Sequence, residues 1–108
     1  MAAWIHIEAV GWPKKVRIKV KLRDGSETGP PLSGDVIIRI RKDGETHSSR
    51  KLGLNDEDLV ANVVNGNWVS PEWNYQYWAD QGYGRLVASF QGQKFAWSAN
   101  RSAKTRLG

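Results

Sequence analysis

The 108-residue chain contains no cysteine. A disulfide scaffold and a zinc site built on thiolates are therefore excluded, and an ordinary hydrophobic core has to stabilise the fold. Long apolar runs are also missing, since none approaches the roughly 20 residues that a helix needs to cross a bilayer. Residues 1–8 (MAAWIHIE) lack a basic start and an unbroken apolar stretch, so we expect no signal peptide. The length is typical of a single domain.

Residue types that carry catalysis or bind metals are scarce. The two histidines, His6 and His47, lie on different predicted strands. Neither has a carboxylate at a sequence spacing that indicates an orienting partner, which favours surface or edge roles. The acidic residues crowd only at Asp56–Asp58, where the alternate spacing and turn glycine of a calcium loop are absent. We therefore predict a protein that is not an enzyme and has no catalytic residues, metal or cofactor.

What the sequence does contain is a clear strand pattern. Residues 15–22 alternate strictly between cationic and apolar side chains, and residues 35–41 repeat the apolar alternation. A period of two with β-branched residues predicts half-buried strands. The apolar positions on the predicted core faces are Val16, Ile18, Val20 and Leu22 in the first strand and Val36, Ile38 and Ile40 in the second.

The other elements are predicted from turns and caps. Asp43-Gly44 predicts a hairpin with a polar return strand over 45–52, and Gln91-Gly92-Gln93 joins strands over 85–90 and 94–98. Residues 4–12 add another strand. For residues 56–65 the acidic first turn after Asn55 predicts a short helix, although the valines there suit a strand about equally well.

These elements predict a mainly β fold, an antiparallel sandwich of about six or seven strands, with a small β-barrel or roll as the alternative. Residues 1–100 would form the single β domain, and residues 101–108 a flexible basic tail.

The stretch Arg23-Asp24-Gly25 followed by residues 31–36 (PLSGDV), with Gly82-Tyr83 ahead of the hairpin over 86–97, resembles the immunoglobulin-like (Ig-like) modules of bacterial surface and phage structural proteins. The resemblance covers about half of the chain, and residues 45–80 have no counterpart in it. It implies an Ig-like sandwich with a binding or structural role on a cell surface or virion. It also implies that Tyr83 is a corner tyrosine whose hydroxyl binds the backbone.

The net charge of +5 is concentrated in the first half, which holds most of the cations. If the two best strands are neighbours, six cations share one outer face: Arg17, Lys19, Lys21, Arg23, Arg39 and Arg41. Like charges directly opposite each other are destabilising unless an anion compensates them. This basic face predicts a polyanionic partner. The alternative is that the lysines only block edge pairing and that the acids of residues 55–80 cover them.

Five of the six tryptophans fall into two groups. Trp4 and Trp97 lie in predicted strands and are either core or sheet-face residues, and we favour the core for both. The remaining aromatic residues of interest crowd one loop: Trp68, Trp73, Tyr75, Tyr77 and Trp78. Such a cluster is either a small core under the loop or a platform for a sugar, a base or a protein partner.

These features favour a non-catalytic Ig-like binding or structural module that uses the aromatic loop and the basic face, with a protein or glycan as its partner. The alternatives are a nucleic-acid-binding protein that uses the basic face and a carbohydrate-binding module. Polar side chains typical of sugar sites, such as Asn74 and Gln76, lie beside the loop tryptophans.

Overall fold

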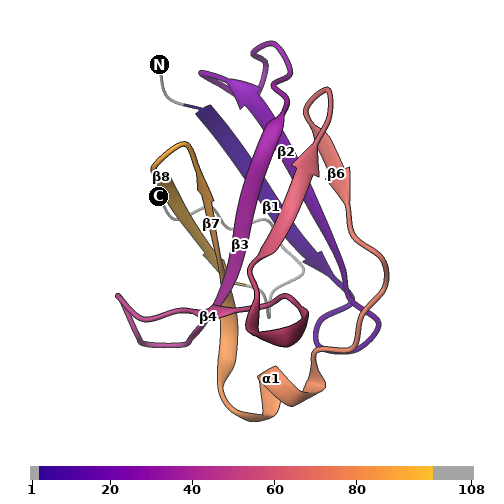
Figure 1. The fold of residues 1–108 in the computed structure, drawn as a ribbon, viewed down its shortest axis with the longest axis vertical. Helices are drawn as coiled ribbons and strands as arrows, with labels where there is room; N and C mark the ends of the chain where they lie inside the picture. Colours follow the sequence, from indigo (N-terminus) through magenta and orange to yellow (C-terminus); the bar gives the residue numbers. More distant parts are fainter. Residues whose placement is uncertain (1–2, 99–108) are drawn as a thin grey trace.

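Two antiparallel sheets form the fold in the computed structural model, which describes residues 3–98 (Figure 1). The first sheet has the order β1-β2-β6, with bounds Ala3–Val10, Arg17–Asp24 and Asn67–Val69. In the second sheet β3 (Gly34–Lys42) pairs with β7 (Tyr83–Phe90) on one side and with β4 (Arg50–Lys51) and β5 (Leu59–Val63) on the other. The strand β8 (Gln93–Ser98) pairs with β7. We call these the β1–β2–β6 sheet and the β3–β7 sheet.

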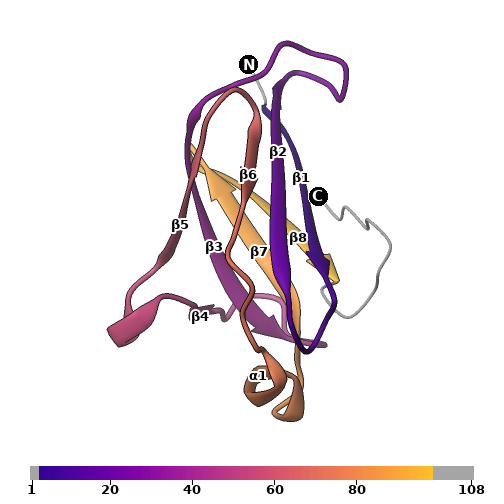
Figure 2. The ribbon, with the colours of Figure 1, turned by 90° about the vertical axis from the view of Figure 1, so that its right-hand side faces the viewer.

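The core lies between the two sheets because β1, β2, β3 and β5 turn every second side chain toward the other layer. Figure 2 shows β1 and β2 on one side of the molecule and β3 and β5 on the other. The β2 residues predicted to face inward are fully buried, as are those of β3. The mainly β sandwich predicted from the alternation is confirmed, and the described strands form no closed barrel. The largest fully buried apolar side chains are Ile5, Ile7, Ile18, Leu22, Ile38, Ile40 and Leu86.

The connection between β2 and β3 carries the chain from one sheet to the other. Gly29-Pro30-Pro31 folds back on the end of β2, where Asp24 N donates to Pro30 O at 2.9 Å and Leu32 N to Leu22 O at 3.2 Å. Prolines lack the N–H that a regular ladder needs, so the paired strand ends here. The next strand then begins in the opposite layer.

The predicted helix over 56–65 is wrong. A single 3-10 turn, η1 (Leu54–Asp56), precedes the strand β5, which pairs with β3 from Gly34↔Val63 to Ile38↔Leu59. Within β5 the buried Ala61 and Val63 alternate with exposed neighbours, so the burial has the period of a strand. The open edge of β3 and the β-branched side chains together outweigh the acidic first turn.

Two further expectations need correction. The return strand predicted over 45–52 is only the two-residue β4, Arg50–Lys51, although the turn at Asp43-Gly44 is present. A short helix, α1 (Gln76–Asp80), was not predicted; it lies at one end of the sandwich, beside the start of β7 (Figure 1). No helix within residues 3–98 is long and apolar enough to cross a membrane. The tail predicted over 101–108 lies outside the described residues.

Candidate functional site

The aromatic loop between β6 and β7 packs against the end of the sandwich. Trp68 lies in β6 opposite Val20, so it points toward the core. Trp73 is held by two backbone hydrogen bonds to Val16, from Val16 N to Trp73 O at 2.6 Å and from Trp73 N to Val16 O at 2.8 Å. Tyr75 is buried, with only 5% of its surface exposed. The segment is therefore fixed to β2 by main-chain contacts.

Ring contacts connect the loop to both sheets' ends. Tyr75 stacks on Trp73 with centroids 6.3 Å apart and meets the edge of Trp12 at 5.5 Å. Trp78, on α1, meets Tyr83 of β7 edge-on at 5.1 Å. Burial raises the pKa of the Tyr75 phenol above its ordinary value. These contacts are those of a small core under the loop.

Tyr77 is the exception in the aromatic loop. Its side chain is 71% exposed, while Trp68, Trp73 and Trp78 are half-buried against the core. A flat platform for sugars or bases needs several open ring faces, and one exposed tyrosine does not provide that.

The cationic residues of β2 lie on the outer face of the β1–β2–β6 sheet. Arg17, Lys19 and Lys21 are exposed and alternate with buried apolar residues. Lys19 and Lys21 make no hydrogen bond or ion pair within the described part of the chain, whereas Arg17 Nη1 is 3.4 Å from Ser70 O. Arg23 differs, because it is half-buried and its Nη1 donates to Gly66 O at 2.7 Å and to Leu22 O at 3.0 Å. Arg23 thus ties β2 to the β5–β6 turn.

Apolar residues lie beside these cations on the same face. Val10 of β1 is opposite Arg17, and Val69 of β6 is opposite Lys19. Their side chains are 42% and 54% exposed. We call the surface formed by Val10, Arg17, Lys19, Lys21 and Val69 the β2 face. Sequence reasoning missed its two valines because only the cross-strand register places them there.

Trp4 also lies on the outer side of this sheet, so the core role expected for it is wrong. It alternates with the buried Ala3 and Ile5 and stacks on His6 with centroids 5.9 Å apart. Nε2 of His6 is 3.8 Å from Oε1 of Glu8. The prediction for the Trp97 side chain lies outside what the structure describes.

The six predicted cations do not form one face. The strands β2 and β3 belong to different sheets, so Arg39 and Arg41 lie on the outer side of the β3–β7 sheet, across the core from Lys19 and Lys21. The condition that the two strands are neighbours fails because the proline-rich connection switches layers. The basic surface is therefore divided between two opposite sides of the molecule.

One of the displaced arginines is neutralised. Arg39 Nε donates to Asp58 Oδ1 at 2.7 Å, and Nη2 donates to Oδ2 at 3.1 Å. These hydrogen bonds hold the pKa of the Asp58 carboxyl below its ordinary value and raise that of Arg39. Arg39 therefore matches the alternative considered for the basic residues, that an acidic side chain from residues 55–80 covers the cation. Within residues 3–98, no group of three His, Cys, Asp or Glu side chains is arranged to hold a metal ion.

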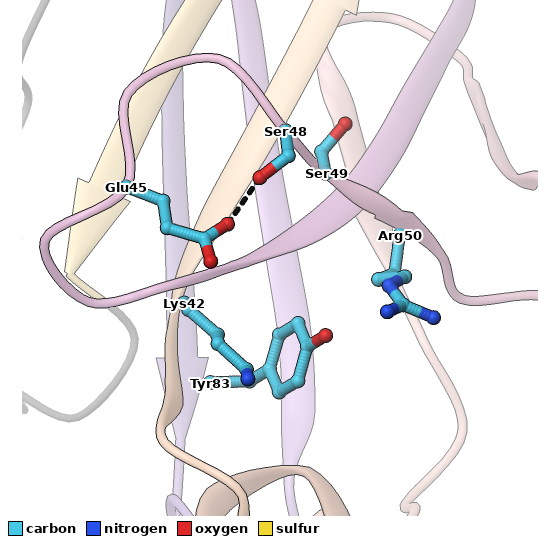
Figure 3. A pocket seen from close by; sticks show the side chains of 6 residues that line it. All are labelled: Lys42, Glu45, Ser48, Ser49, Arg50 and Tyr83. Atoms are coloured by element: carbon cyan, nitrogen blue, oxygen red, sulfur yellow. Dashed lines mark hydrogen bonds between the residues drawn. The ribbon is translucent and has the colours of Figure 1, made fainter.

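A small cavity of about 120 Å³ lies between the β3–β4 loop and β7 (Figure 3). Lys42 Nζ lies over the Tyr83 ring, 5.5 Å from its centroid, and Ser48 Oγ donates to Glu45. The Tyr83 hydroxyl makes no hydrogen bond within residues 3–98, so the backbone contact implied by the corner tyrosine is not present. The lining residues are Lys42, Glu45, Ser48, Ser49, Arg50 and Tyr83.

This cavity lacks an arrangement for nucleophilic catalysis. Each of its serines would need a base held within hydrogen-bond reach and oriented by a third group. The one such neighbour is Glu45, which already accepts a hydrogen bond from Ser48 at the exposed rim.

No family model, curated protein or solved structure matches the chain.

Proposed function

We propose that this protein is a non-catalytic, Ig-like binding module that engages an acidic protein partner through the β2 face. The observation that carries the proposal is the pair Lys19 and Lys21, exposed side by side on one sheet face. Neither lysine forms an ion pair in the described part of the chain, although Glu8 is the register partner of Lys19. Exposed cations in a row attract acidic surfaces and steer association.

The valines of the β2 face favour a protein over other polyanions. Val10 and Val69 flank the cations and remain open to solvent. Protein interfaces combine apolar contact area with charged groups around it, whereas sulfated glycans and phosphate backbones are recognised mainly by charge and hydrogen bonds.

The burial of the aromatic loop argues against the two alternatives. A carbohydrate-binding module and a single-stranded nucleic-acid binder both need open aromatic faces beside the polar contacts. Here Tyr75 is buried and Trp73 and Trp78 are half-buried at the end of the sandwich, leaving only Tyr77 of that loop open. In this proposal the loop mainly holds the sandwich together.

The Ig-like assignment rests on the two-layer antiparallel sheet together with the sequence pattern of residues 23–36 and 82–97. A sandwich of this kind presents the outer face of a sheet to a partner, which is the use we propose for the β2 face. From the same resemblance we propose that the module acts on a cell surface or a virion.

Binding to four polyanions tests the proposal. Polyglutamate and a copolymer of glutamate and tyrosine represent the acidic protein, heparin the acidic glycan and an oligothymidylate the nucleic acid. Affinities are measured by fluorescence titration at low and moderate salt. We expect the tightest binding to a copolymer of glutamate and tyrosine, weaker binding to polyglutamate, and a loss of the copolymer's advantage in Val69→Ser. Tighter binding to the oligothymidylate than to either polypeptide would instead support the nucleic-acid alternative and overturn this one.

A further inference from the structure

Two arginines lie directly opposite each other on the outer side of the β3–β7 sheet. Arg41 of β3 and Arg85 of β7 are register partners, next to the row in which Ile40 and Leu86 point into the core. Side chains at directly opposite positions of an antiparallel pair project from the same face with Cβ atoms about 5 Å apart. The two arginine side chains, both positively charged, therefore start from adjacent positions on one face.

These guanidinium groups have few partners of their own. Arg41 Nε donates to Ser48 O at 2.9 Å, a main-chain contact that fixes the β3–β4 loop. Arg85 Nε is buried and has no hydrogen-bond partner within residues 3–98. No carboxylate of the described chain pairs with either arginine. A like-charged pair with an unpartnered buried donor is unfavourable unless an acceptor is supplied.

The next row of the same face contains such an acceptor. There Arg39 receives the carboxylate of Asp58 on its Nε and Nη2 groups. This is the two-point geometry in which arginine binds a planar oxyanion. The row of Arg41 and Arg85 presents two arginines and no acid.

We infer that Arg41 and Arg85 together bind an oxyanion, either a carboxylate or a phosphate group, bridged between the two guanidinium groups. Arg41 is oriented for this by its bond to Ser48 O, and Arg85 supplies the Nε–H donor that the chain leaves unused. The site lies on the opposite side of the molecule from the β2 face, so it does not rest on the function proposed above.

Arginine side-chain NMR tests the site. The Nε–Hε signals of Arg41 and Arg85 are followed while sodium phosphate or sodium acetate replaces sodium chloride at constant ionic strength. Arg23, on the other sheet and outside the β2 face, is the control because its Nη1 already donates to main-chain oxygens. We expect saturable shifts at Arg41 and Arg85 and none at Arg23. Saturation with phosphate alone identifies a phosphate ligand, and saturation with acetate alone a carboxylate. Absent shifts, or equal unsaturable shifts at all three arginines, would overturn the inference.

Two variants separate the site from general charge effects. Arg85→Lys keeps the charge but loses the planar fork, so the affinity for the saturating anion should fall about tenfold. Arg41→Lys makes the same test from the other side if Arg85→Lys does not fold. Lys19→Gln/Lys21→Gln should leave the shifts unchanged. Wild-type affinity in both arginine variants would contradict a bridged oxyanion even if the β2 face binds as proposed.

Discussion

Asp58 binds Arg39 through two hydrogen bonds, from Nε to Oδ1 at 2.7 Å and from Nη2 to Oδ2 at 3.1 Å. The contact joins the segment before β5 to the middle of β3. The hydrogen bonds from Arg39 hold the pKa of Asp58 below its ordinary value of 3.8, so the unfolded state takes up the proton first as the pH falls. The stabilisation is therefore complete above pH 3.8 and is lost as the pH falls through the lower pKa of the folded protein.

The variant Asp58→Asn tests this pH dependence. At neutral pH we expect its free energy of unfolding to be lower than that of the wild type by no more than about 1 kcal/mol, because the pair is partly exposed. As the pH is lowered below 3.8 the two free energies should converge. Urea unfolding at a series of pH values measures both. If the difference in the free energy of unfolding between the two proteins stays constant at acidic pH, the charge of the Asp58 carboxylate is not the source of the stabilisation.

Two tyrosines of the aromatic loop provide a matched comparison. Tyr75→Ala should lower the free energy of unfolding by about 3 kcal/mol, because it empties a buried site between Trp12 and Trp73. Tyr77→Ala should change it by no more than about 0.5 kcal/mol, because that side chain is largely exposed. Chemical denaturation monitored by tryptophan fluorescence measures both values. Similar costs for the two variants would refute the view that the loop forms a small core.

A buried serine connects the aromatic loop to β2. Ser70 Oγ accepts from Ile18 N at 2.8 Å and donates to Pro71 O at 2.7 Å. Ser70→Ala leaves a buried N–H without its side-chain acceptor, and we expect it to lower the free energy of unfolding by roughly 2 kcal/mol. Ser26→Ala, at an exposed position, serves as the control. Faster amide exchange at Ile18 in the first variant alone would confirm the mechanism, and unchanged exchange would contradict it.

The turn between β5 and β6 depends on a glycine. Gly66 has φ +78°, and an added Cβ would lie 2.8 Å from Leu22 O and closer still to Arg23 Nη1. Gly44 has a similar φ of +87° but open space around it. Gly44→Ala should therefore cost about 1 kcal/mol from the backbone conformation alone, and Gly66→Ala roughly 2 kcal/mol more. Thermal unfolding measures the loss of stability in each variant. Equal losses in the two variants would contradict the role of steric crowding at Gly66.

The sequence predicted the individual strands well wherever one face is buried. In residues 16–22 and 36–40 the alternation is a direct record of burial, so the strands and their core faces were predicted correctly. It failed at residues 56–65, where the acidic residues resemble a helix start. There the deciding fact is the free edge of β3, which no local pattern contains.

The candidate sites were harder to predict because they depend on which strands pair. Lys19 and Arg39 look equivalent along the chain, yet one lies exposed in the first sheet and the other is bound to Asp58 in the second. The pairing of Arg41 with Arg85 and of Lys19 with Val69 likewise follows from register alone. The local alternation specifies which side chains share a strand face but not which faces meet.

The most direct test of the binding proposal is the affinity of two double variants for polyglutamate. Lys19→Gln/Lys21→Gln removes two charges from the β2 face, and Arg50→Gln/Lys51→Gln removes two exposed charges from β4 in the other sheet. Two exposed ion pairs of about 0.7 kcal/mol each predict roughly tenfold weaker binding for the first variant. The second should change the affinity by less than about twofold, since screening limits the reach of distant charges. Equal losses in the two variants would contradict the account, because binding would then follow net charge and not the β2 face.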